Sequence, residues 1–383
     1  MQDSIKPYFY MKFSTSSTDL LKHLQIAGGA ISTNPVLPIL EDFLFTISDN
    51  RLKITASDLE TTIITSMDII AETAGSVAVP AKILIETLKA LPEQPVTFEV
   101  DEDSNGISVT SAYGKYKLSG ENGADFPETP SFAEGNEIEL LGGILSQAIA
   151  NTIFATSNDD LRPTMTGVYF QIDTDQVTFV ATDAHKLVKY TSKINNSDVS
   201  TSFIVPKKAL NMLRMSLHTN EPVKISFNKS NAFFAFGDFQ MACRLIDGRF
   251  PDYNAVIPVN NPNLLTIRRT DFLSSIKRIA IYANKTTNQV LFKIEGSTLN
   301  ISSKDLDFSN EAEETLTCTY DGSPLNISFN AKFLIEMLNV LNADDINMEL
   351  SVPNRAGIIR PVEQEDSIDL LMLVMPVMTN TAS

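Results

Sequence analysis

The sequence predicts an α+β protein built from three copies of one unit, each with two helices on antiparallel sheets. The first observation behind this is a repeated helical segment, because residues 79–91 match residues 329–341 at seven of thirteen positions. A looser third copy occupies residues 205–217. The second observation is a repeated strand pattern, in which apolar and polar residues alternate before a turn, at residues 52–58, 177–183 and 299–305. Repeats of this kind determine the fold of the whole chain.

The helices follow in order along each unit. A helical pattern opens each unit, at residues 18–27, 141–155 and 270–283, and a second helix comes later, at residues 82–91, 205–217 and 329–341. These helices are amphipathic: Leu84, Leu88 and Leu91 share one face by the 3.6-residue period. Lys82 and Glu86 lie on the opposite face. Helices that alternate with short strands in this order indicate antiparallel sheets covered on one face.

Domain boundaries are expected where the repeats meet. The segments 121–136 and 247–263 are rich in proline and are interpreted as linkers. The sequence therefore predicts a leader of residues 1–10 outside the repeat and domains of residues 11–130, 131–256 and 257–383. The alternative is three α+β domains whose similarity is due to chance.

Composition excludes several classes of protein. With 43 % hydrophobic and 20 % charged residues, the chain is globular rather than disordered or fibrous. Two cysteines are too few for a disulfide framework. The N-terminus lacks an apolar signal region, and the apolar segment 368–378 is shorter than the roughly 20 residues that span a bilayer. We expect a soluble, cytoplasmic protein.

Positive charge gathers on the inferred helices. With the residue before each, they carry ten lysines and arginines and four acidic residues, a net +6, whereas the whole chain carries −17, so the remainder carries −23. One interpretation is that lysine and arginine are good helix formers on solvated faces. The other is that the helices share a surface that meets a polyanion through its phosphates, without sequence specificity.

The sequence lacks the motifs of common catalytic sites. It contains no phosphate-binding loop and no G-x-G motif. His185 follows Thr182 and Asp183, but neighbouring residues on an extended chain point in alternating directions, and no strained elbow exposes a nucleophile. We therefore expect no catalytic residue, no metal site and no cofactor. The alternative is a monomeric enzyme of three related domains whose catalytic residues are not recognisable.

Several segments resemble the bacterial DNA sliding clamp, the β subunit of DNA polymerase III holoenzyme. They are Phe179-Val-Ala-Thr-Asp-Ala-His-Lys-Leu187, Val205-Pro-Lys-Lys, Leu245-Ile-Asp-Gly-Arg-Phe-Pro-Asp-Tyr253 and Leu373-Val-Met-Pro376. The resemblance runs from about Met11 to Met378. It implies a homodimeric ring that encloses duplex DNA and tethers the replicative polymerase as a processivity factor. An ATP-driven clamp loader would open the ring.

The resemblance also implies a cleft for partner peptides of the type Q-x-x-[L/M]-x-F, carried by other replication and repair proteins. The matching residues are Met165, Thr182, His185, Leu187, Pro251, Val256, Leu373, Val374, Met375, Pro376 and Val377. Such a set, mostly apolar and containing methionine, suits several ligands. The alternative is that residues 371–377 form only a buried last strand. Ala255 and Asn34 depart from the family, which often has basic residues at these positions.

Two further surfaces follow from the same resemblance. The DNA-facing candidates are Lys22, Lys82, Lys89, Lys207, Lys208, Arg214, Lys277, Arg278 and Lys332. Tyr116 and Leu118 on one edge strand, and Ile281 and Tyr282 on another, resemble the interface between the two copies. Such an interface joins two different surfaces head to tail, and it closes into a ring only if the rotation fits.

Overall fold

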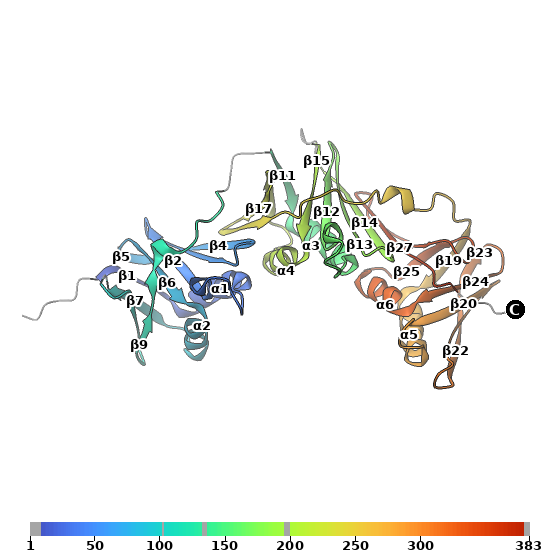
Figure 1. Ribbon diagram of the computed structural model, residues 1–383, viewed down its shortest axis with the longest axis horizontal. Coiled ribbons are helices and arrows are strands. Elements are labelled where there is room, and N and C mark those ends of the chain that lie inside the picture. Colours follow the sequence, from blue (N-terminus) through green and yellow to red (C-terminus); the bar gives the residue numbers. More distant parts are fainter. Residues whose placement is uncertain (1–8, 102, 132–135, 195–199, 379–383) are drawn as a thin grey trace, which may run out of the picture. The chain divides into compact units, whose positions relative to one another are not determined.

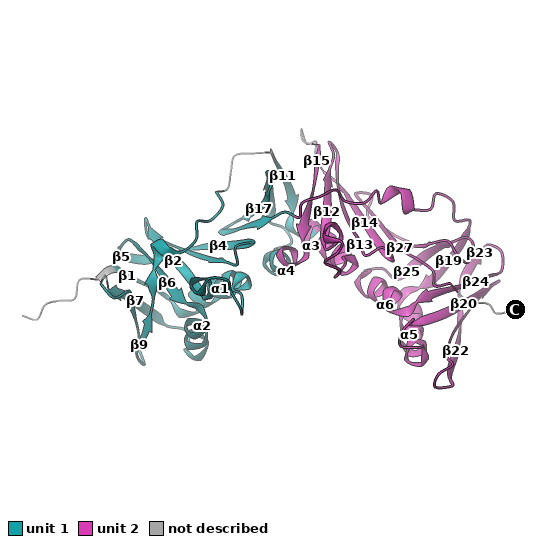
Figure 2. Cartoon of the chain, in the orientation of Figure 1, with its two compact units in different colours: residues 1–143, 211–245 teal, residues 144–210, 246–383 magenta. Residues whose placement is uncertain are grey.

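The computed structural model describes residues 9–101, 103–131, 136–194 and 200–378. It divides into two compact units, residues 1–143 with 211–245 (unit 1) and residues 144–210 with 246–383 (unit 2) (Figure 2). The division runs through the central repeat, so each unit contains one outer repeat and part of the central one.

Unit 1 contains the first repeat and four strands of the central one (Figure 1). Its helices are α1 (Ser17–Ala27) and α2 (Ala81–Ala90), with short 3-10 turns η1 (Gly28–Ala30), η2 (Pro38–Glu41) and η3 (Gly123–Asp125). Its strands are β1 (Phe9–Ser16), β2 (Asp42–Ser48), β3 (Arg51–Ser57), β4 (Thr61–Asp68), β5 (Ile70–Thr73), β6 (Gly75–Pro80), β7 (Pro95–Asp101), β8 (Gly106–Ser111), β9 (Gly114–Ser119), β10 (Glu121–Asn122), β11 (Asn136–Leu141), β16 (Pro222–Phe227), β17 (Asn231–Phe236) and β18 (Phe239–Arg244).

Two antiparallel sheets form unit 1. One has five strands in the order β5-β1-β7-β8-β9, and the other has nine, in the order β10-β6-β2-β3-β4-β18-β17-β16-β11. The nine-stranded sheet crosses from the first repeat to the central one where β4 pairs with β18. Helix α1 packs against α2 and against β3 and β4. Phe13, Phe45 and Phe98 are buried and contact one another, and the rings of Phe13 and Phe98 stack with centroids 4.8 Å apart.

Unit 2 contains the rest of the central repeat and the whole third repeat. Its helices are most of α3 (Gly142–Thr152), the first part of α4 (Lys207–Ser216), α5 (Arg269–Ile279) and α6 (Ala331–Val340), with 3-10 turns η4 (Ile153–Ala155), η5 (Pro163–Met165), η6 (Asn254–Val256) and η7 (Ala280–Tyr282). Its strands are β12 (Gly167–Ile172), β13 (Gln176–Thr182), β14 (Lys186–Lys193), β15 (Thr201–Pro206), β19 (Asn263–Arg268), β20 (Gln289–Glu295), β21 (Thr298–Asp305), β22 (Asn310–Thr317), β23 (Thr319–Asp321), β24 (Leu325–Asn330), β25 (Asp345–Leu350), β26 (Gly357–Pro361) and β27 (Ile368–Val374).

Unit 2, like unit 1, contains one nine-stranded and one smaller antiparallel sheet. One has nine strands in the order β15-β12-β13-β14-β27-β26-β25-β19-β23, and the other has four, in the order β22-β21-β20-β24. Here the crossing between repeats is the β14–β27 pair. Helix α5 packs against α6 and β22. Arg269 links these helices, since its guanidinium donates to the carbonyl oxygens of Leu338 and Ala343 near the end of α6.

The repeated helices and strands predicted from the sequence are confirmed. Helices expected at residues 18–27 and 82–91 form at Ser17–Ala27 and Ala81–Ala90, and strands expected at 52–58 and 177–183 form at Arg51–Ser57 and Gln176–Thr182. Leu84 and Leu88 are buried, as the amphipathic pattern predicted. In the described residues, no helix is long and apolar enough to cross a membrane.

The interpretation of residues 247–263 as a linker was wrong in one respect. Phe250 and Tyr253 are buried in this segment and pack among the core residues of unit 2. The prolines suggested an exposed connection, but the aromatic side chains between them supply apolar area that the core takes up. The segment is thus part of the packed structure.

A buried carboxyl lies at the start of β2. Asp42 is 8 % exposed, and burial raises its pKa to about 6, with further contributions from the negative charges of Glu121 and Glu41. Because the folded pKa exceeds the ordinary value of 3.8, the folded state binds the proton more tightly than the unfolded state. The ionised carboxyl therefore destabilises the fold above pH 6, and stability rises as the pH falls from 6 towards 4.

We predict that Asp42→Asn stabilises unit 1 at pH 8 by about 1–3 kcal/mol, because the amide removes the cost of burying a charge. The gain should shrink at pH 4–5, where the native carboxyl is already protonated. Urea denaturation at both pH values measures this, with Asp125→Asn, an exposed aspartate of the same unit, as the control. A stabilisation equal at both pH values would contradict the assignment.

Candidate functional site

The turn between β13 and β14 is held by hydrogen bonds from polar side chains of the candidate site and its neighbours. The Asp183 carboxylate accepts the backbone N–H groups of His185 and Lys186, each at 2.9 Å. The Thr182 hydroxyl donates to the Lys186 carbonyl at 2.8 Å and accepts the Ala184 N–H at 3.1 Å. These bonds hold Ala184 at a φ of 75°, a left-handed conformation that is unfavourable for alanine. The T-D-x-H segment therefore forms a rigid turn.

Lys186 anchors this turn to helix α6. Its side chain is only 6 % exposed and pairs with Asp183 at 2.7 Å and Glu336 at 3.1 Å. The ammonium also lies 4.6 Å from the centre of the Phe333 ring, and the His185 ring stacks on the same ring at 6.1 Å. A buried charge is tolerated only when it is paired and hydrogen-bonded, and here both conditions are met. The sequence offered little sign of this arrangement, apart from a lysine directly after the T-D-A-H motif.

The end of β27 passes beside this turn. Val374 is the last residue of the β27 ladder, opposite Lys186, and the Met375 N–H donates to the His185 carbonyl at 2.9 Å. The chain then changes neighbours, because Pro376 bridges Phe329 and the Val377 N–H donates to Ser328 at 2.8 Å. A proline suits this change because it has no N–H to leave unpaired.

An apolar cluster lies beneath the strand end. Leu187 and Leu373 are buried and pack with Phe250 and Tyr253. The Tyr253 hydroxyl donates to Gln171 at 2.8 Å, which ties the 247–253 segment to β12. The D-G-R-F-P-D-Y motif is therefore a packing element as well as a candidate binding element.

The predicted peptide-binding residues differ in their exposure. Four are buried and would form a floor (Thr182, Leu187, Leu373 and Val374), four are half-buried (Met165, Pro251, Pro376 and Val377), and three are exposed (His185, Val256 and Met375). The strand-end residues and the turn of β13–β14 are brought together by the bonds above. Gly248, at a φ of 118°, lies against Thr164 beside Met165, and a Cβ there would meet the Thr164 methyl at 2.8 Å. Val256 lies apart in η6.

The predicted DNA-facing cations lie on helices, and most are exposed. Lys82 and Lys89 lie on α2, Lys332 lies on α6, and Lys207, Lys208 and Arg214 lie on α4, where Lys207 is half-buried. Lys22 pairs with Asp19 of the same helix at 3.1 Å, and Lys277 donates to Asn339.

Arg278 differs from the other cations. Its guanidinium donates two hydrogen bonds of 2.7 Å to the Glu314 carboxylate of β22, which raises the pKa of Arg278 and lowers that of Glu314. This bidentate pair leaves little net charge at the position. Arg278 is therefore the weakest member of the set as a phosphate contact.

The predicted interface residues lie on two different kinds of element. Tyr116 and Leu118 belong to β9, the outer strand of the five-stranded sheet, as expected. The expectation that Ile281 and Tyr282 lie on an edge strand was wrong, because they form the 3-10 turn η7 after α5. The helical pattern simply continues past Ile279. Both side chains are nevertheless exposed, and η7 packs beside β22, an edge strand of the four-stranded sheet.

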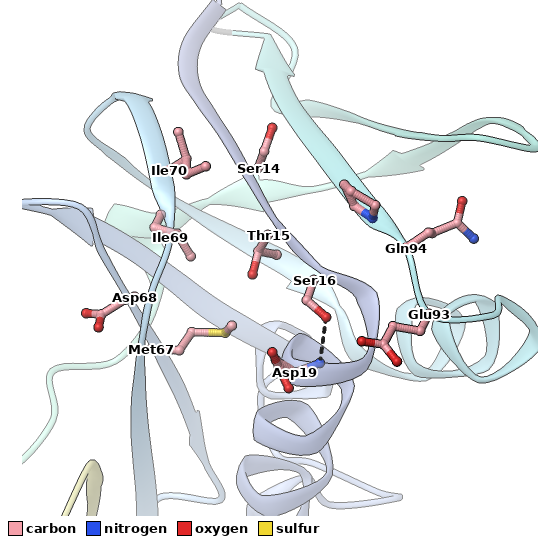
Figure 3. Close-up of a pocket in the computed structure, with 11 residues that line it drawn as sticks. Ser14, Thr15, Ser16, Asp19, Met67, Asp68, Ile69, Ile70, Glu93 and Gln94 are labelled. Carbon is pink, nitrogen blue, oxygen red and sulfur yellow. Dashed lines mark hydrogen bonds between the residues drawn. The ribbon is translucent and has the colours of Figure 1, made fainter.

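A separate pocket of about 800 Å³ lies in unit 1, between the start of α1 and the strand ends of β4 and β7 (Figure 3). Met67 and Ile69 line its apolar side, and Asp19, Asp68 and Glu93 contribute carboxylates. The Asp19 N–H donates to Ser16 at 3.4 Å, so this part of the pocket wall is the cap of α1. Its lining residues contain no cation and no histidine.

Comparisons with known proteins cover nearly the whole chain. Models of the DNA polymerase III beta subunit match residues 11–130 for its N-terminal domain, 139–252 for its central domain and 254–376 for its C-terminal domain. The chain is 30% identical to the beta sliding clamp of Escherichia coli K12, over 89% of this chain and 93% of that one. It is 28% identical to that of Vibrio cholerae, over 96% and 100%.

Solved structures of sliding clamps are similar to this chain over nearly its whole length. The sliding clamp of Pseudomonas aeruginosa bound to griselimycin superposes with a TM-score of 0.91 at 26% identity, over 96% of this chain and 100% of that one. The DNA polymerase sliding clamp of Bacillus subtilis gives a TM-score of 0.91 at 26% identity, over 97% and 100%.

We predict that Lys186→Ala destabilises unit 2 by about 2–4 kcal/mol, because it leaves the Asp183 carboxylate, half enclosed, without its cation. Lys189→Ala on the same strand should change stability little. Thermal and chemical unfolding of the two variants measures the difference. Equal small effects would mean that the buried pair contributes no net stability.

Proposed function

The chain belongs to the family of the DNA polymerase III beta subunit, the bacterial beta sliding clamps, and we propose that two copies close head to tail into a ring around duplex DNA. As a processivity factor it would tether the replicative polymerase, and an ATP-driven clamp loader would open the ring. Other repair and replication proteins with a Q-x-x-[L/M]-x-F peptide would share its binding surface. The chain itself would catalyse no reaction and need no cofactor, and it would act in the cytoplasm.

The strand order carries the proposal of a ring. In both nine-stranded sheets, the fourth strand of one repeat pairs with the last strand of the next, as β4 with β18 and β14 with β27. The corresponding strands left at the ends are β22, on the four-stranded sheet, and β9, on the five-stranded sheet. Pairing β22 of one copy with β9 of another would complete a third nine-stranded sheet. It would also satisfy the free backbone groups of both edges.

Both internal junctions use the same register. Ile64 of β4 stands opposite Gln240 of β18, and Lys189 of β14 stands opposite Leu371 of β27. These pairs occupy equivalent positions when residues are counted through the neighbouring ladders of each repeat. The register at the third junction can therefore be inferred by the same count.

The inferred register pairs opposite charges. It sets Lys115 of one copy opposite Glu313 of the other, and Lys117 opposite Glu311. These four side chains are exposed, whereas Tyr116 between the lysines is half-buried. Opposite charges on facing strands contribute roughly 0.2–1 kcal/mol per pair and disfavour a slipped register.

The first junction also supports Ile281 as an interface residue. Gly29 holds the same place in η1 that Ile281 holds in η7, since each is the middle residue of a 3-10 turn after an 11-residue helix. A Cβ at Gly29 would lie 3.8 Å from Met212 of α4, a helix of the next repeat. Ile281, 66 % exposed in the single chain, would take the same place against the second copy.

For DNA, we propose phosphate contacts from the exposed lysines of the helices. Lys82, Lys89 and Lys332 are suited to this, because their side chains are exposed on helices of two different repeats. Enclosure by a ring requires only weak attraction, so an acidic chain can still hold DNA. Arg278 would contribute little while Glu314 neutralises it.

To test enclosure, the protein should be loaded on nicked circular and on linear duplex DNA and recovered by gel filtration. We expect retention on the circle and loss from the linear molecule through its free ends. Equilibrium binding should be weak and fall steeply with salt, as phosphate contacts do. Equal retention on both molecules would indicate ordinary binding and contradict enclosure.

We predict that Lys115→Cys with Glu313→Cys forms a disulfide between copies under mild oxidation, because directly opposed strand residues have Cβ atoms about 4.5–5.5 Å apart. Lys115→Cys with Thr317→Cys, four residues away on β22, should not. The native Cys243 and Cys318 are buried, and burial raises the pKa of both thiols, so they should stay unreactive. A non-reducing gel reports the product, and cross-linking of the control pair instead would refute the register.

We predict that Met375→Ala weakens binding of a Q-x-x-L-x-F peptide roughly tenfold, because the side chain is 40 % exposed and so loses only part of its burial energy. Calorimetric titration beside a melting curve checks this, with the more exposed Met378→Ala as the control. A large fall in melting temperature at unchanged affinity would make Met375 a core residue.

A further inference from the structure

The hairpin between β21 and β22 ends in two exposed apolar side chains. Leu306 is 78 % exposed and Phe308 is 74 % exposed, in a tight turn where Ser309 has a φ of 55°. Figure 1 shows the hairpin extending from the four-stranded sheet. Two large apolar side chains at one loop tip indicate a contact surface rather than ordinary solvent exposure.

The corresponding hairpin of the central repeat shows what such a tip can contact. There the ladder ends with Thr182 opposite Leu187, whereas in the third repeat the ladder continues past the pair Lys304–Glu311 to Asp305 opposite Asn310, so the hairpin is one strand pair longer. The central turn packs on α6 of the next repeat, with Lys186 and His185 over the Phe333 ring at 4.6 and 6.1 Å. A hairpin tip that meets the second helix of the following repeat is thus part of an internal junction.

The residue equivalent to Phe333 in the first repeat is Ile83. Both are the third residue of a 10-residue helix, α6 starting at Ala331 and α2 at Ala81. Ile83 is 49 % exposed although it is apolar. At the proposed joint between copies, α2 of the second copy takes the place that α6 has beside the central turn.

We infer that Leu306 and Phe308 of one copy pack on Ile83 of the second copy and form an apolar latch over the strand joint. The inference rests on the proposed ring. At the internal junction a cation lies over an aromatic ring, whereas here the tip and the helix are both apolar. The additional strand pair Asp305–Asn310 lengthens the hairpin and extends the reach of its tip over the helix. The latch accounts for three exposed apolar side chains that the single chain leaves in water, because a second copy would cover them.

The test measures the dimer dissociation constant by sedimentation for three variants: Leu306→Ser with Phe308→Ser, Ile83→Ser, and all three together. Each side of the latch should weaken the dimer by about tenfold or more, since each removes buried apolar area. The dissociation constant of the combined variant should be only slightly higher than that of either single-side variant, because the two sides contribute to one contact. The control Leu161→Ser changes a leucine that is 91 % exposed elsewhere and should have no effect.

The outcomes separate the latch from the ring. Phe308→Cys with Ile83→Cys should also cross-link between copies. If the tip variant keeps the wild-type dissociation constant while the Lys115→Cys and Glu313→Cys pair still cross-links, the ring stands and the latch is refuted. Effects of the two sides that simply multiply would also refute direct contact. If the wild-type chain stays monomeric and neither cysteine pair cross-links, the ring is refuted and the latch with it.

Discussion

Antiparallel strand pairing across repeat boundaries is the constraint on which the rest of this structure depends. A sheet edge leaves a row of backbone donors and acceptors that must find partners in protein or water. Each repeat meets the next by joining such edges, at β4–β18 and at β14–β27. The helices and hairpin turns then pack around those junctions. The peptide-binding candidate follows from this, since the strand that ends at Val374 lies there because it pairs with β14.

The same junction explains why packing residues and candidate binding residues are interleaved in unit 2. Leu187 and Leu373 face each other across the β14–β27 ladder and belong to the core. Met375, two residues beyond Leu373, leaves that ladder and is exposed. A partner peptide would therefore meet a surface whose floor is already held by strand pairing and by the buried Lys186. Little rearrangement would be needed on binding, which favours affinity.

Local periodicity explains how much of this could be predicted. The helices and the repeated strands were predictable because their patterns of 3.6 and 2 residues are local properties of the sequence. Lys186 was not, because its burial depends on Phe333 and Glu336, which are distant in sequence. Ile281 was assigned to a strand although it forms a 3-10 turn, and the segment with Phe250 was assigned to a linker. For Phe250, tertiary packing outweighed the local signal of the prolines. For Ile281, the local helical pattern of residues 270–283 was the better guide, and the strand assignment came from the resemblance.

The two edges proposed to pair between copies, β9 and β22, are unlike each other, and this has a genetic consequence. In the proposed ring each copy contributes one edge to each of two joints, so damage confined to β22 leaves the β9 edge of the same copy able to pair. Mixed with intact protein, such a copy would occupy one good joint and leave the other open. The defect would then act dominantly, spoiling assemblies that contain a sound copy, rather than as a simple loss of half the protein.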